Sequence, residues 1–142
     1  MAGISLSRAR TIIRRAFEAG KEMGLQPLSV IVLDEGGNVQ AFERQDGAAP
    51  GRYQIAHGKA YGAVMLGMPG SAQMARAESQ AYFIAAANGA FGGALIPVPG
   101  GVLVKDAKGR VIGAVGVTGD SSDNDAAVAK AGIESVGLVA VV

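Results

Sequence analysis

One stretch of the chain decides how the rest is interpreted, and it holds the only histidine. From residue 53 to residue 65 it reads Tyr53-Gln54-Ile55-Ala56-His57-Gly58-Lys59-Ala60-Tyr61-Gly62-Ala63-Val64-Met65. In a helix, a step of four residues overshoots a full turn by about 40°, so side chains at such steps share one broad face. Those side chains are Tyr53, His57, Tyr61 and Met65, and Lys59 lies nearly opposite His57. We therefore predict a helix over residues 52–66 with aromatic and soft ligands on one side and an ammonium on the other.

The composition indicates one globular domain over residues 1–142. Hydrophobic residues make up 49% of the chain and charged residues 18%, which is typical of a chain with a packed core. The 13 basic and 12 acidic residues nearly cancel. This balance argues against a nucleic-acid or anionic-membrane partner, because such partners are attracted by a basic patch.

The sequence also indicates where the protein works. It contains no cysteine, which excludes disulfides, thiolate metal sites and a cysteine nucleophile. Residues 1–5 lack the apolar core of a signal peptide, and arginines follow closely. No apolar run is long enough and free enough of glycine to span a bilayer. We expect a cytoplasmic protein with no membrane partner.

Apolar periodicity predicts a helix followed by a hairpin in the first part of the chain. Ser5 or Ser7 can cap this helix, and Arg14 and Lys21 fall mostly on its solvated face. Its apolar stripe comprises Leu6, Ala9, Ile12, Ile13, Ala16 and Phe17. Residues 28–33 and 39–44 read as antiparallel strands, since the first is rich in β-branched residues and the second alternates. Residues 34–38 form the tight turn between them.

The second part of the chain predicts another helix, another hairpin and a last helix. Ser71 is expected to cap an alanine-rich helix over residues 72–88. Residues 102–105 and 111–117 read as strands, and the latter is apolar on both faces and hence central. A capping cluster at residues 120–124 precedes a helix over residues 125–136, and the apolar tail 137–142 is expected to pack on the fold or on a partner. These elements predict an α+β domain with an antiparallel sheet covered by helices.

Six segments in one order resemble the GlcG/HbpS family of haem-binding proteins, which also covers the C-terminal domain of some corrinoid adenosyltransferases. The segments are Asp34…Gly37, Arg44-Gln45-Asp46-Gly47-Ala48, Lys59-Ala60, Pro99-Gly100-Gly101-Val102, Ile112 to Gly119, and Asp125…Ala131-Gly132. The resemblance covers nearly the whole chain. It implies a profilin-like fold with a five-stranded antiparallel sheet flanked by helices, and self-assembly as dimers or larger rings. It further implies haem binding for some members and a place in catabolic gene clusters for others, a few of which are suspected enzymes.

The residues of the 52–66 helix offer two interpretations. His57 can ligate haem iron through a neutral imidazole nitrogen or transfer a proton near pH 7. Tyr53 and Tyr61 can ligate ferric iron or stack on a porphyrin, and Met65 can add a soft contact. The alternative is a core stripe, with a hydrogen-bonded histidine and two aromatic rings packed on the sheet.

Charged residues around this helix also leave alternatives open. Arg44 and Lys59 could clamp a carboxylate, and Lys59 could act as a base or form a Schiff base if desolvated. Asp46 is expected to form an internal salt bridge with Arg44 or Lys59 that pins the hairpin to the helix. Asp120, Asp123 and Asp125 are expected to cap a helix, because their spacing does not complete a calcium loop. We predict no metal site.

Small residues elsewhere leave room for a close approach. Gly100 and Gly101, and the glycines from Gly113 to Gly119, permit either a ligand or a second subunit to come near. They are not a phosphate loop, since no Lys-Ser or Lys-Thr pair follows.

Two functions follow from these assignments. The first is a self-associating ligand-binding protein whose pocket is formed by the Tyr53–Met65 helix, Arg44, Gly100, Gly101 and Thr118. It would hold haem or a similar planar molecule that carries carboxylates. The second is an enzyme of a catabolic pathway that performs tautomerase-like or lyase-like proton transfer on a small organic or aromatic acid. In the enzyme, His57 or a tyrosine would move the proton while Arg44 or Lys59 held the carboxylate.

Overall fold

A computed structural model describes residues 3–142, so Met1 and Ala2, part of the stretch expected to lack a signal core, lie outside the described residues. In chain order the elements are α1 (Leu6–Glu22), β1 (Ser29–Asp34), β2 (Val39–Arg44), α2 (Arg52–Leu66), α3 (Gly70–Ser79), α4 (Ala81–Ala90), β3 (Gly101–Lys105), β4 (Val111–Thr118), α5 (Ser122–Ser135) and β5 (Val139–Val141). The α+β class, the two hairpins and the helix over residues 52–66 are confirmed.

The strands form one antiparallel sheet in the order β2-β1-β4-β3-β5. β4 is the middle strand, as its two apolar faces predict. The apolar tail packs on the fold by forming β5, in which Val141 pairs with Leu103 of β3. The five-stranded sheet that the resemblance implied is therefore confirmed.

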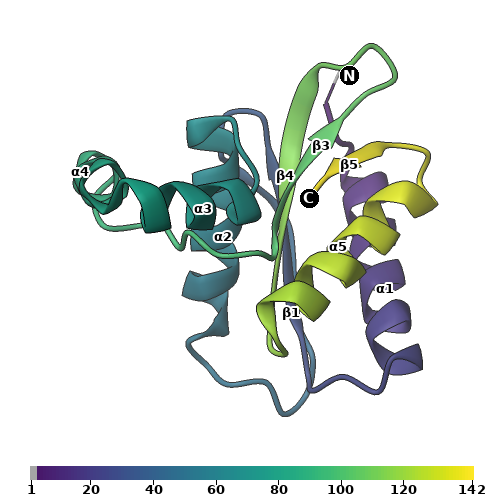
Figure 1. Ribbon diagram of the computed structural model, residues 1–142. Coiled ribbons are helices and arrows are strands. Elements are labelled where there is room, and N and C mark those ends of the chain that lie inside the picture. The colour runs from purple at the N-terminus through teal and green to yellow at the C-terminus, as the bar shows by residue number, and fades with distance from the viewer. Residues whose placement is uncertain (1–2) are drawn as a thin grey trace.

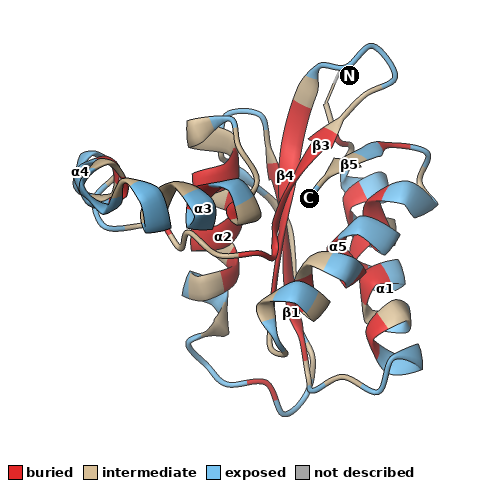
Figure 2. Cartoon of the chain, in the orientation of Figure 1, coloured by how far each residue is buried: buried red, intermediate tan, exposed pale blue. Residues whose placement is uncertain are grey.

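Helices cover both faces of the sheet, with α1 and α5 on one face and α2, α3 and α4 on the other (Figure 1). Alternate side chains of each strand point to opposite faces, so the sheet builds two apolar clusters. Val30 and Val32 of β1 pack with α1 and α5, whereas Ile31 and Leu33 pack with the alanines of α2. Buried residues concentrate along β1, β3, β4 and the sides of the helices that face them (Figure 2).

The alanine-rich segment 72–88, predicted as one helix, is two helices. The break falls at Gln80, whose φ of −142° and ψ of 66° are not helical. The Ser79 hydroxyl donates to the Arg76 carbonyl, 3.3 Å away, and the Gln80 N–H donates to the same oxygen. The two helices therefore meet at a residue that ends α3 with a regular helical bond and has a non-helical backbone itself.

The predicted helix starts are correct at α1 and need correction at α3 and α5. The Ser5 hydroxyl accepts a bond from the N–H of Arg8 and caps α1. α3 begins at Gly70 with Pro69 as its N-cap and no side-chain cap hydrogen bond, so Ser71 lies inside the helix and does not cap it. α5 begins at Ser122 and is capped by Ser121, which lies within the predicted capping cluster.

Candidate functional site

α2 carries three ring side chains in a single line along its length. The ring centroids of Tyr53 and His57 are 6.0 Å apart with an interplanar angle of 25°. Those of His57 and Tyr61 are 5.2 Å apart at 20°. Side chains four residues apart on a helix are neighbours, so this stacking follows from the sequence spacing. We call Tyr53, His57 and Tyr61 the aromatic row.

Two phenylalanines from other elements flank the aromatic row. Phe42 of β2 contacts Tyr53 edge-on, with the ring centroids 4.9 Å apart. Phe91, just after α4, contacts Tyr61 edge-on at 6.1 Å. Sequence reasoning did not include either of them, because both contacts join segments that are distant along the chain. They limit how far the two end rings can move.

The aromatic row is neither a buried core stripe nor a freely solvated one. Tyr53 is 38% exposed, while His57, Tyr61 and Met65 are half-buried. Met65 and Tyr61 reach toward the hairpin turn, where a side chain at Gly37 would meet the Met65 methyl group at 2.9 Å. Each of these four side chains is therefore partly accessible to solvent.

His57 is the titratable group of the row that its surroundings perturb. Partial burial lowers the pKa of His57 below its ordinary value of 6.5, and no hydrogen bond or charge from the described residues contributes to the shift. Burial disfavours the charged form of an imidazole. The ring is therefore neutral at pH 7, and a neutral ring can offer a nitrogen lone pair to a metal.

Lys59 points to the other side of α2, as its position opposite His57 predicts, and it is buried. Its Nζ donates to the Val117 carbonyl at 3.0 Å and lies 3.2 Å from Oδ2 of Asp125. Asp125 belongs to α5 on the far face of the sheet and is 1% exposed. Its Oδ1 accepts a bond from the N–H of Asp120. The ion pair thus ties the two helical layers together.

Burial and the partner's charge shift the pKa of each member of this ion pair in opposite directions. Burial lowers the pKa of Lys59, and the carboxylate of Asp125 counteracts that effect. Burial raises the pKa of Asp125, and the Lys59 ammonium counteracts it. Each partner therefore depends on the other to remain charged. The sequence assigned Asp125 to helix capping, and its Oδ1 does accept the N–H of Asp120 just before α5. The ion pair that its Oδ2 forms with Lys59 was not predicted.

The start of β3, with Gly100 just before it and Gly101 as its first residue, lies against this buried side of α2, as does the end of β4. A side chain at Gly101 would meet the backbone carbonyl of Lys59, and one at Gly100 would lie 2.8 Å from its Nζ. The hydroxyl of Thr118 accepts a bond of 2.7 Å from Nη1 of Arg52. Residues of α2 therefore fill the space around Gly100, Gly101 and Thr118. This space is separate from the aromatic row.

The salt bridge expected for Asp46 does not form. Lys59 pairs with Asp125, and Nη1 of Arg44 donates instead to the Ala48 carbonyl at 2.7 Å. Asp46 is exposed. Asp46 cannot pair with Lys59 because Lys59 is buried between α2 and the sheet, whereas Asp46 is in the exposed loop after β2.

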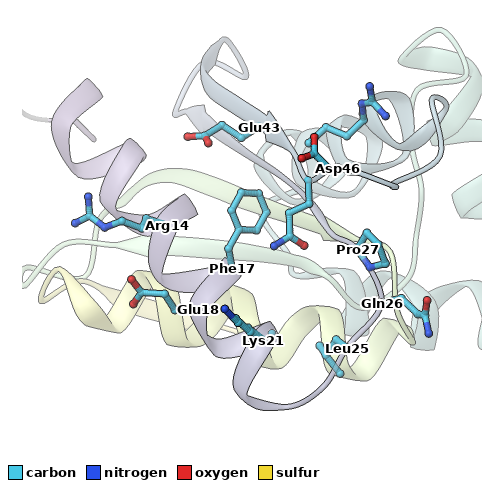
Figure 3. Close-up of a pocket in the computed structure, with 12 residues that line it drawn as sticks. Arg14, Phe17, Glu18, Lys21, Leu25, Gln26, Pro27, Glu43 and Asp46 are labelled. Atoms are coloured by element: carbon cyan, nitrogen blue, oxygen red, sulfur yellow. The ribbon is translucent and has the colours of Figure 1, made fainter.

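The described residues also form a groove of about 690 Å³, on the α1 side of the fold (Figure 3). Its walls are the second half of α1, residues 25–27 and residues 43–46, and none of them belongs to α2. The sequence placed Arg14 and Lys21 on a solvated face and did not reveal that β2 ends opposite them. Arg44 lines this groove, whereas the aromatic row does not.

Residues 3–142 contain neither a cluster of metal-binding side chains nor a membrane-spanning helix. No three histidine, aspartate or glutamate side chains of residues 3–142 gather closely enough to hold a metal ion. In the same residues, no helix combines the length and apolar character needed to cross a membrane.

The fold and the site define an α+β domain with helices on both faces of a five-stranded antiparallel sheet and a partly exposed aromatic row on one helix. The family model described as "Haem degrading protein HbpS-like" matches residues 4–134. The chain belongs to this HbpS-like family, so the family resemblance predicted from the sequence is confirmed.

Solved structures of other proteins share this fold. HbpS has a TM-score of 0.82 and 30% identity, over 96% of this chain and 92% of that chain. A double mutant of HbpS from Streptomyces reticuli has a TM-score of 0.81 and 31% identity, over 96% and 89%. A PduOC–heme complex has a TM-score of 0.85 and 20% identity, over 96% and 97%, and shares the fold alone. No curated protein sequence matches this chain at a significant level.

Proposed function

We propose that this protein binds haem, or a comparable planar molecule that carries carboxylates, at the aromatic row and Met65 of α2. Membership of the HbpS-like family supports this proposal, as does a solved heme complex of the same fold. The observation that carries it for this chain is the neutral, half-buried His57 ring, stacked between two tyrosines on a surface that solvent reaches.

The donor atoms of this surface suit haem iron. Iron in haem accepts an imidazole nitrogen, a tyrosine oxygen or a methionine sulfur as an axial ligand. His57 is our first choice because its ring is neutral and no hydrogen bond contributes to its pKa shift. Tyr53 and Tyr61, whose rings lie within 25° and 20° of the plane of the imidazole, would then flank His57 and contact the same face of the ligand with their ring edges. Bound haem supplies an iron centre whose reactivity depends on its axial ligand.

The contacts of the other candidate residues narrow the proposed surface. Lys59, Gly100, Gly101 and Thr118 are committed to packing between α2 and the sheet, and we leave them out. Arg44 stays in the proposal as the cation for a carboxylate. It lies two residues after Phe42 on β2, and residues at that spacing share a face of a strand.

The proton-transfer alternative receives less support from these contacts. Its lysine is buried, with its ammonium held by Asp125 and the Val117 carbonyl, so it is not free to act as a base or to form a Schiff base. His57 and the tyrosines remain available to either function. We therefore rank ligand binding first.

Self-association and a cytoplasmic location are also part of the proposal. α4 contains no charged residue, and it exposes alanines together with Tyr82, which is 72% exposed. An exposed surface of this kind supports contact with a second copy as a dimer or a larger ring. The absence of cysteine fits a reducing compartment.

Haemin added to the purified protein is expected to give a shifted Soret band that saturates at one haem per subunit. His57→Ala should shift that band and weaken binding about tenfold or more, because the iron loses its axial nitrogen. Tyr61→Phe should alter the band without abolishing binding. Tyr82→Phe, on α4, is the matched control and should leave the spectrum unchanged. A band insensitive to both changes on α2 would contradict the proposal.

The affinity for haemin should depend on pH through His57. Because burial lowers the pKa of His57 from 6.5, its ring takes up a proton at a lower pH than an ordinary imidazole does. The dissociation constant should therefore rise as the pH falls, with a midpoint below 6.5, because protonation removes the lone pair. Absorbance titrations at several pH values measure this. A rise with a midpoint above pH 6.5 would contradict His57 as the ligand.

A further inference from the structure

The groove beside α1 has two charged walls. In Figure 3, Arg14 and Lys21 extend from α1 on one side, Glu43 and Asp46 lie on the other, and the Phe17 ring projects between them. Two further charged residues of the lining already have partners: Glu18 on the α1 wall pairs with Arg15, and Arg44 on the opposite wall donates to the Ala48 carbonyl. The groove therefore offers two cations on one wall, two anions on the other and an aromatic side chain in the middle. The fold creates it by bringing the end of β2 across the second half of α1.

Four charged residues of the groove form no ion pair among the described residues: Arg14, Lys21, Glu43 and Asp46. Among the described residues, the ion pairs are Arg15 with Glu18, Lys59 with Asp125, and Arg110 with Asp106. None of them joins the two walls. Charges that face a shared space without pairing can each bind a group of opposite sign on a ligand.

The walls are held in place by hydrogen bonds from the rest of the fold. The Gln45 side chain accepts a bond of 2.7 Å from the N–H of Leu28, and the Gln45 N–H donates to the Leu28 carbonyl at 2.9 Å. The N–H of Leu25 donates to the Gly20 carbonyl at the end of α1. A ligand therefore meets a preformed site and loses little affinity to reorganisation of the walls.

We propose that this groove is a second binding site, for a small zwitterion with an apolar stem, such as a dipeptide with free termini. Its carboxylate would meet Arg14 and Lys21, its ammonium would meet Glu43 and Asp46, and its stem would cover Phe17, Leu25 and Pro27. A volume of about 690 Å³ lies within the range of small-molecule sites. No residue of α2 lines this site, and Arg44 is the one lining residue that the proposed haem surface also uses.

The test uses the full chain and leucyl-phenylalanine as the probe. Titration followed by nitrogen–proton correlation spectra should shift amide signals of residues 14–27 and 43–46 and leave those of α2 in place. The N-acetylated probe lacks the ammonium and the C-terminal amide lacks the carboxylate, so each should bind about tenfold more weakly. No shift in the groove, or equal binding of the capped probes, would overturn the proposal.

Single substitutions test which wall of the groove binds which end of the dipeptide. Lys21→Gln should weaken binding of the free dipeptide and remove most of its advantage over the amide. Glu43→Gln should likewise remove the advantage over the acetylated probe. Lys108→Gln, in an exposed turn away from the groove, is the matched control and should change neither ratio. Groove shifts that instead follow protein concentration without the probe would assign the groove to a second copy and overturn the proposal.

Discussion

Asp125→Ala is expected to lower the free energy of unfolding by about 3 to 5 kcal/mol, because it leaves a buried ammonium without its counter-charge. Lys59 is only 3% exposed, so water cannot take the place of the carboxylate. The Val117 carbonyl would remain as its hydrogen-bond partner. The loss is measured by urea unfolding followed by circular dichroism.

Two controls separate the ion pair from a simple loss of side-chain volume. The double variant Lys59→Met with Asp125→Leu removes both charges and should recover much of the lost stability, as apolar replacement of buried ion pairs often does. Glu18→Ala breaks the pair with Arg15, whose side chains are 51% and 50% exposed, and should cost less than about 1 kcal/mol. A double variant as unstable as Asp125→Ala alone would contradict this account.

Gly116→Ala should destabilise the protein by about 3 kcal/mol or more, at the upper end of the cost of overpacking. A side chain at position 116 of β4 would meet the backbone carbonyl of Ala56 in α2. Because backbone atoms cannot rotate away, α2 would have to move off the sheet. The lowered midpoint of thermal or urea unfolding measures the effect.

The matched control for Gly116→Ala is Gly89→Ala, near the end of α4. A side chain at Gly89 has no neighbouring atom within 4 Å, and alanine favours a helix over glycine by up to about 1 kcal/mol. This variant should be as stable as the parent or slightly more stable. Equal stabilities of the Gly116→Ala and Gly89→Ala variants would contradict the account that close packing of α2 on β4 stabilises this layer.

The sequence alone sufficed to predict the layers and the two sides of α2. Periodicity of four placed His57 and Lys59 on opposite sides of one helix, and the structure places one half-buried and the other inside. The double apolar face of β4 similarly predicted that this strand is central. These features depend on neighbours along the chain, where sequence patterns carry most of their information.

Partners that are distant along the chain could not be predicted in this way. Lys59 meets Asp125 across 66 positions, and nothing in the local pattern distinguishes that aspartate from a helix cap. The family resemblance implied a fifth strand, but no sequence pattern indicated that residues 139–141 pair with β3. The groove beside α1 depends on where β2 ends in space.

The placement of α4 has a consequence for how the molecule fluctuates. Among the helices and strands it packs chiefly against α3, and most of its surface is open to water. Segments with few buried neighbours open at lower free energy than the core, without global unfolding. Phe91, which follows α4, closes one end of the aromatic row. The proposed ligand surface therefore borders a segment that is expected to open at lower free energy than the core, and a molecule bound there would favour the closed member of the native ensemble.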